Sequence, residues 1–116
     1  MTFLLKFDFP SNLRIRKSSE FEEVFKKGNR LNGDHYTLVY KENSLGFPRL
    51  GLVVGKKCGN VIERNRIKRI IREIFRLNKP LFNSLDLLVI AKRKSEALNY
   101  NDAEGEIKRI FKPRLK

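Results

Sequence analysis

The chain has 116 residues, 41% of them hydrophobic and nine of them Phe, which suffices for one compact domain over residues 1–116 and leaves little room for a second. Its 26 basic and 13 acidic residues give a formal charge of +13, which indicates a polyanionic partner, nucleic acid or an anionic membrane surface. A single cysteine excludes a disulfide framework and fits a reducing cytoplasm. No apolar run approaches the roughly 20 residues needed to span a bilayer, so we expect a soluble, cytoplasmic protein that is not inserted in a membrane.

Residues 1–12 are expected to form an irregular arm, and the first helix is predicted over residues 19–27. Ser19 and Glu22 have the spacing of a capping box, in which each side chain bonds the backbone amide of the other residue. Gly28 then supplies a stop at the C-terminal end of the helix. One apolar stripe along this helix consists of Phe21, Val24 and Phe25.

Two runs that are typical of β-strands follow, over residues 35–41 and 49–56. The turn-rich segment 42–48 between them favours an antiparallel hairpin with a long loop, and whether residues 30–34 form a further strand stays open. Alternation along the first run predicts two faces, with Tyr36, Leu38 and Tyr40 on one and Thr37 and Val39 on the other.

The best-defined element is a helix over residues 61–77, which Asn60 and Glu63 can cap. At about 100° per residue, its core-facing arc consists of Ile67, Ile70, Ile71, Ile74 and Phe75. Beside this arc runs a cationic row of Arg64, Lys68 and Arg72, extended by Asn65, Arg69 and Arg76, while Arg66 lies further round.

A continuous apolar run over residues 86–92 predicts a strand that is buried on both faces. A last helix is expected to be capped by Asn101 or Asp102 and ended by Pro113. The order is α-β-β-α-β-α, or α-β-β-β-α-β-α if residues 30–34 pair separately, which indicates an α+β sheet with helices packed on it. The apolar stripe of the last helix consists of Ala103, Ile107, Ile110 and Phe111.

The cationic row suits phosphate groups, because Arg guanidinium groups bond them bidentately and released counterions drive association. Like charges one turn apart cost an isolated helix a few tenths of a kcal/mol per pair, and a merely solvated face would mix in acids. A solvated face nevertheless stays the alternative. Weaker support comes from Gly55 and Gly59, which permit close backbone approach, and from the amides at the start of the helix, which favour an anion.

No catalytic group of the chain's own is indicated. His35 is the only histidine, and a lone histidine beside a strand is far more often structural than a general base. Cys58 lacks a His/Asp constellation, and the 13 acids show no metal-ligand motif. For Phe21 and Phe25 two interpretations stay open: packing in the core, or stacking of one ring edge on unpaired bases at roughly 1–3 kcal/mol per base.

Three segments of the chain resemble one known family. The run GLVVGKKCGNVIERNRIKRIIREIF, residues 51–75, is similar to the signature of the protein component of bacterial ribonuclease P, whose hallmark is the segment seen here as Arg64-Asn65-Arg66. The run LRIRKSSEFEEVFKKGNR, residues 13–30, resembles the first helix of that family, and DLLVIAKRK, residues 86–94, resembles its fourth strand. Together these similarities cover most of residues 13–112.

The resemblance implies an α+β fold of the order α-β-β-β-α-β-α, with a mostly antiparallel four-stranded sheet and a left-handed βαβ crossover. It also implies a non-catalytic protein subunit of the endoribonuclease ribonuclease P, in which the RNA subunit and its Mg²⁺ ions cleave precursor tRNA at the 5′ end. The implied partners are the RNA subunit and the 5′ leader of precursor tRNA. By the same resemblance the leader cleft would involve Phe21, Phe25, Arg64, Lys68 and Arg72. The basic motif surface near the RNA subunit and its metal ions would involve Lys56, Lys57, Asn65, Arg66 and Arg69.

Two other classes of protein remain as rivals. A ribosomal or other structural RNA-binding protein would share the charge and the α+β shape, but it would not prefer precursor over mature tRNA. A protein-only nuclease would cleave without added RNA.

Overall fold

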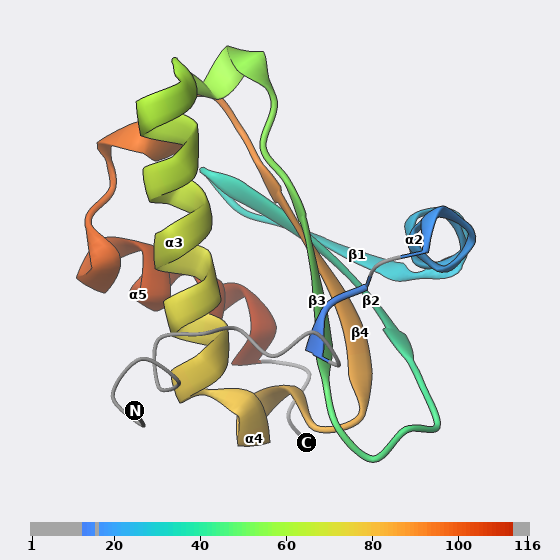
Figure 1. Ribbon diagram of the computed structural model, residues 1–116. Coiled ribbons are helices and arrows are strands. Elements are labelled where there is room, and N and C mark those ends of the chain that lie inside the picture. The colour runs from blue at the N-terminus through green and yellow to red at the C-terminus, as the bar shows by residue number, and fades with distance from the viewer. Residues whose placement is uncertain (1–12, 16, 113–116) are drawn as a thin grey trace, which may run out of the picture.

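A four-stranded sheet lies between helices on both of its faces (Figure 1). The computed structural model describes residues 13–15 and 17–112, so the arm predicted over residues 1–12 and the stop predicted at Pro113 lie outside the described residues. The strands are β1 (Asn29–Asn32), β2 (Tyr36–Glu42), β3 (Arg49–Val53) and β4 (Leu85–Ala91). The α-helices are α2 (Ser18–Lys27), α3 (Val61–Leu77), α4 (Lys79–Phe82) and α5 (Tyr100–Phe111), and two short 3₁₀ helices are η2 (Lys56–Cys58) and η3 (Ser95–Ala97).

The strands are arranged in the order β1-β2-β4-β3. β1 pairs with β2 and β2 pairs with β4, both antiparallel, whereas β3 pairs with β4 in parallel. The predicted hairpin between the second and third strands is therefore wrong, because β4 lies between them. Its apolar sequence Leu-Asp-Leu-Leu-Val-Ile-Ala suits a central strand, which helices cover on both faces. The separate pairing of the 30–34 region, which the sequence left open, occurs as β1.

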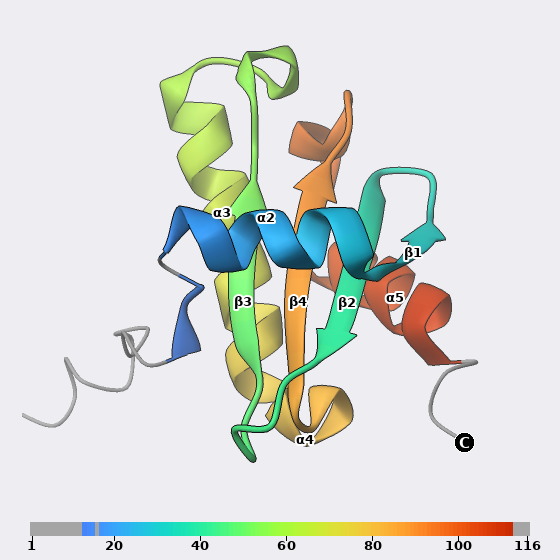
Figure 2. The same ribbon diagram turned by 90° about the vertical axis from the view of Figure 1, so that its right-hand side faces the viewer.

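The connection from β3 through α3 to β4 is left-handed. In Figure 2, β3 and β4 run upward side by side, β4 lies to the right of β3, and α3 returns behind the sheet. Right-handed connections are the strong general rule for parallel strands, so this is an exception to it. The left-handed crossover and the mostly antiparallel sheet confirm the fold that the resemblance implied.

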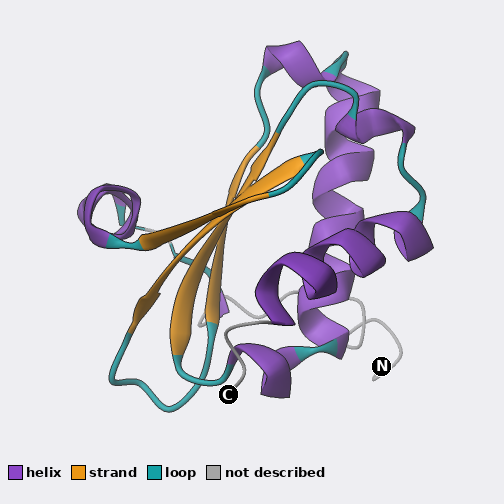
Figure 3. Cartoon of the chain, turned by 180° about the vertical axis from the view of Figure 1, so that it is seen from behind, coloured by secondary structure: helices purple, strands orange, loops and turns teal. Residues whose placement is uncertain are grey.

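The main core lies between the sheet and the pair α3 and α5, which occupy the same face (Figure 3). Alternation along β2 was predicted correctly: Tyr36 and Leu38 are buried in this core, while Val39 points to the other face. The predicted bounds of α3 are confirmed, and its start is fixed by a capping box in which Glu63 N donates to Asn60 Oδ1 at 2.8 Å and Asn60 N donates to Glu63 Oε1 at 2.9 Å. From α3 the core receives Ile67, Ile71, Ile74 and Phe75, with Ile70 half-buried beside them.

A smaller apolar cluster holds α2 on the opposite face of the sheet. Val24 of α2 is buried there with Ile15, Val39 and Leu88, and Phe21 packs against the cluster. The stripe predicted on this helix is thus divided, because Phe25 is 43% exposed. Only Val24 behaves purely as a core residue.

The predicted caps of two helices were wrong. α2 begins at Ser18, and its N-cap Lys17 makes no side-chain capping bond, so Ser19 does not cap it. α5 begins at Tyr100, because its N-cap is Asn99, whose side chain accepts the amide of Asp102 at 2.8 Å; the observed cap lies two residues before Asn101 and three before Asp102. The stop at Gly28 is confirmed, since its amide donates to Val24 O at 2.8 Å. The N-cap is the residue whose side chain actually reaches a free backbone amide of the first turn. Where several polar residues precede a helix, the sequence does not show which of them does so.

An ion-pair network ties α2 to the sheet. Arg49 on β3 donates to both carboxylate oxygens of Asp86 at 2.9 and 2.8 Å, and it reaches Glu20 of α2 at 3.2 Å. The side chains of Arg49 and Asp86 are only 16% and 11% exposed. Asp86 also accepts from Asn43 at 2.9 Å, so the loop before β3 is held by the same carboxylate.

Arg49→Met should lower the free energy of unfolding by about 3 kcal/mol, because it leaves the carboxylate of Asp86 buried without its cation. Urea denaturation measures the change. Lys41→Met is the matched control, since Lys41 meets Glu23 at 3.4 Å on the surface and such pairs contribute about 1 kcal/mol at most. Equal losses in the two variants would contradict a structural role for Arg49.

Candidate nucleic-acid interface

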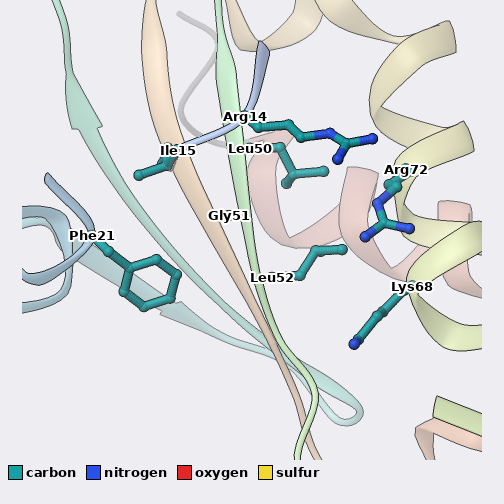
Figure 4. A pocket seen from close by; sticks show the side chains of 8 residues that line it. All are labelled: Arg14, Ile15, Phe21, Leu50, Gly51, Leu52, Lys68 and Arg72. Carbon is teal, nitrogen blue, oxygen red and sulfur yellow. The ribbon is translucent and has the colours of Figure 1, made fainter. Parts of the chain in front are cut away.

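A cleft of about 200 Å³ runs along the edge of β3, between α2 on one face of the sheet and α3 on the other (Figure 4). Phe21 and Ile15 lie on one side of the strand, and three basic side chains lie on the other. The lining residues are Arg14, Ile15, Phe21, Leu50, Gly51, Leu52, Lys68 and Arg72.

The aromatic side of the cleft depends on a glycine. A β-carbon at Gly51 would lie 3.1 Å from Cε2 of Phe21 and 2.6 Å from Cδ2 of the buried Leu88. The absence of a side chain therefore lets the Phe21 ring lie close to β3. Phe21 is only half-buried, so its ring both packs on the small cluster and forms a wall of the cleft.

The opposite side of the cleft is cationic. Lys68 and Arg72 are one turn apart on α3, and Figure 4 shows Arg14 and Arg72 pointing toward one another. Arg14 is placed by pairing with β3, since Ile15 N donates to Leu50 O at 3.0 Å and Arg14 forms a parallel bridge with Leu50. Among the residues that the structure describes, no acid lines the cleft, and neither Lys68 nor Arg72 has an ion-pair partner.

Burial lowers the pKa of Arg72 from its usual value, and the charge of Arg14 lowers it further. A lowered pKa means that the folded protein accommodates the charge less well than water does. Arg72 still carries its proton at neutral pH, because guanidinium groups titrate far above it. Lys68 and Arg72 therefore bring positive charge to the cleft that none of the described acidic side chains pairs with, and an external anion would relieve it.

The structure brings together three of the five residues that were predicted for the leader cleft, namely Phe21, Lys68 and Arg72. Phe25 lies outside its lining, one turn further along α2, with the guanidinium of Arg30 4.7 Å from its ring centre. Arg64 also lies outside the lining, and its Nε donates to Asn60 O at 3.4 Å.

The residues predicted for the basic motif surface are distributed over η2 and α3. Lys56 and Lys57 are exposed on η2, and Asn65 and Arg69 are exposed on α3. Arg66 differs, because it is half-buried and donates to Glu96 O at 3.0 Å, which ties α3 to η3.

Two details change the predicted charge pattern along α3. Arg76, which was expected to extend the cationic row, pairs with Glu73 at 2.6 Å. At the other end of α3, the carboxylate of Glu63 accepts the backbone amide of Asn60 at 2.9 Å. This negative charge at the start of α3 makes the site less favourable for an external anion. The positive charge that α3 presents is thus concentrated between Arg64 and Arg72.

His35 and Cys58, the two residues considered as catalytic groups, both make contacts within the fold. His35 Nδ1 lies 2.7 Å from Glu106 Oε1, and Glu106 Oε2 also accepts the amides of His35 and Tyr36 at 2.7 and 3.1 Å. Cys58 is buried, with its Sγ 3.4 Å from Lys92 O. Over residues 13–15 and 17–112, no group of three or more His, Cys, Asp or Glu side chains is arranged to hold a metal ion.

Sequence reasoning missed part of the cleft. Arg14 belongs to the short basic run Arg14-Ile15-Arg16-Lys17, which has no helical or strand period, so the local sequence gives no indication that Arg14 lies beside α3. Its pairing with Leu50 is a non-local contact. The cleft is also lined by Leu50, Gly51 and Leu52, because β3 is an edge strand paired with β4. The predicted hairpin paired this strand with β2 instead and so gave no indication of that lining.

None of the described helices is long and apolar enough to cross a bilayer.

The fold and the cleft define a class: a small, basic α+β protein with a left-handed crossover and a cationic cleft at one edge of its sheet. The sequence pattern of the family described as Ribonuclease P matches residues 9–114, and the chain therefore belongs to that family. The ribonuclease P protein component of Syntrophus aciditrophicus is 47% identical over 95 residues, which cover 81% of this chain and 80% of that protein.

Solved structures show the same likeness. The RNase P protein of Staphylococcus aureus is 30% identical and superposes with a TM-score of 0.80 over 88% of this chain and 94% of that one. The RNase P protein of Thermotoga maritima in complex with 1-(4-fluorophenyl)-2-thiourea is 31% identical, with a TM-score of 0.79 over 85% of this chain and 97% of that one. These matches confirm the family that the sequence motifs indicated.

Arg72→Met should leave the free energy of unfolding unchanged or raise it by a few tenths of a kcal/mol at low salt. The folded-state pKa of Arg72 is lowered, so its charge opposes folding at every pH at which it is present, and removing it removes that cost. Added salt should stabilise the wild type more than the variant, because salt screens the repulsion. Thermal melts at two salt concentrations measure both effects, with the exposed Arg109→Met as control. A drop of several degrees in the variant alone would show that Arg72 stabilises the fold instead.

Proposed function

We propose that the chain is the protein subunit of the ribonucleoprotein ribonuclease P. In this proposal it binds the single-stranded 5′ leader of precursor tRNA and the catalytic RNA, and thereby assists Mg²⁺-dependent endonucleolytic maturation of tRNA at the 5′ end. The observation that carries the proposal is the cleft, where Phe21 faces the edge of β3 opposite Lys68 and Arg72 and where no acid of residues 13–15 and 17–112 pairs with these two cations. Membership in the family described as Ribonuclease P supports it.

The cleft suits a single strand better than a duplex. Lys68 and Arg72 are separated by one helical turn, about 6 Å along α3, so they can bind neighbouring phosphates of an extended strand. The half-exposed ring of Phe21 offers a face on which an unpaired base can stack, and stacking does not depend on base identity. Electrostatics and stacking together give affinity for a strand of variable sequence.

The basic motif surface is assigned to the RNA subunit. It consists of Lys56 and Lys57 on η2 and of Asn65, Arg66 and Arg69 on α3. Arg66 presents only part of its guanidinium outward, because NH1 is bonded to Glu96 O. In this proposal the Mg²⁺ ions are bound by the RNA, bond cleavage belongs to the RNA subunit, and the protein acts in the cytoplasm as a positioning and charge-compensating partner.

Adding the protein to a ribonuclease P RNA at limiting Mg²⁺ should restore 5′ processing of precursor tRNA, because the protein would supply cationic charge that Mg²⁺ otherwise provides. The assembled complex should also bind precursor tRNA more tightly than mature tRNA. Gel-based cleavage and binding assays measure these outcomes. Equal binding of the two tRNAs would favour a structural RNA-binding protein, and cleavage by the protein without added RNA would favour a protein-only nuclease.

Lys68→Ala should flatten the dependence of leader affinity on salt by up to about 0.7 in log–log slope, because one phosphate contact is lost from a single strand. The measurement compares binding of a precursor with a long leader at several salt concentrations. Arg109→Ala removes an exposed cation that does not line the cleft, and it should leave the slope unchanged. A slope in Lys68→Ala equal to that of the wild type would remove Lys68 from the phosphate contacts.

A further inference from the structure

Val61 and Ile62 form an exposed apolar pair on the first turn of α3. They are 60% and 79% exposed, although exposed β-branched side chains lower helix propensity and the first turn of a helix favours acidic residues. Single exposed apolar residues need no explanation. An adjacent pair that departs from the local preference, without any gain from burial in the described fold, indicates a contact outside the chain.

The surroundings of the pair are cationic. Lys56 and Lys57 are exposed on η2, which immediately precedes the capped start of α3. Glu63 is the only acid between residues 54 and 72, and its carboxylate is engaged by the amide of Asn60 at 2.9 Å. A partner of this surface must therefore combine negative charge with apolar faces. RNA does so, because its phosphates alternate with riboses and bases.

The two members of the pair begin different rows of α3. Ile62 is followed at i+3 and i+7 by Asn65 and Arg69, which are exposed and lie within about 60° of it around the helix axis. Val61 lies instead at the head of the row that contains Lys68 and lines the cleft. Ile62 thus belongs to the outer surface, away from the cleft.

We propose that Ile62 lies against the base or ribose face of the structured RNA subunit, while Lys57 and Arg69 bind phosphates on either side of it. Val61 lies between this contact and the cleft. The proposal rests on the proposed function and deepens it, because it adds an apolar, salt-independent contact to a surface for which only polar and charged contacts were predicted.

The test measures the affinity of the full-length protein for a ribonuclease P RNA at fixed Mg²⁺ and at several salt concentrations. Ile62→Ala should weaken binding about fivefold, because part of the apolar surface removed from water in the complex is lost. The salt slope should not change, since no charge is removed. Alanine has the higher helix propensity, so the variant should melt no lower than the wild type.

Leu77→Ala is the matched control, because Leu77 is 55% exposed at the opposite end of the same helix. It should bind the RNA like the wild type. Ile62→Ala binding as tightly as the wild type, or Leu77→Ala losing as much affinity, would overturn the role of Ile62 and leave the proposed function intact. Failure of the wild type to bind the RNA would overturn the proposed function and this contact together.

Discussion

The packing of the isoleucine face of α3 on the sheet is the interaction on which the rest of the structure depends. Ile67, Ile71 and Ile74 are each at most 2% exposed, and burying such a side chain stabilises the fold by about 1.5–3 kcal/mol. Like charges one turn apart on the same helix cost only a few tenths of a kcal/mol. Burial of the isoleucines therefore fixes the rotation of α3 about its own axis. As a consequence Lys68 and Arg72 lie at the boundary of the core, although their charges do not stabilise the folded state.

The cleft exists because β3 is an edge strand. β4 occupies the centre of the sheet, so only residues 13–15 reach the outer side of β3 in the described structure. The left-handed crossover then carries α3 to the face opposite α2. As a result one strand edge separates an aromatic wall from a cationic wall, and Gly51 allows the aromatic wall to come close.

Much of this arrangement was predictable from local sequence, and the rest was not, for identifiable physical reasons. The bounds of α3 follow from a capping box and a helical period, and the faces of β2 follow from alternation, because both are properties of neighbouring residues. The pairing of β3 with β4 is decided by competition between strands distant in sequence, and a turn-rich loop between adjacent strands misled the prediction toward a hairpin. Similarly, a helical projection places Arg66 on the surface but does not reveal Glu96, thirty residues away, as its partner.

α3 has three faces with three different tasks under the proposed function. The isoleucine face anchors the helix, the row of Lys68 and Arg72 faces the cleft, and the outer row of Ile62 and Arg69 faces away from it. An α-helix with its side chains is about 10–12 Å wide, so a strand in the cleft and an RNA on the outer face would be held at a fixed separation by one rigid element. Arg66 strengthens that rigidity, because its bond to η3 resists rotation of the first turns of α3. The buried face thus sets the spacing between the two RNA contacts, and a change in core packing would alter both contacts even though it touches neither.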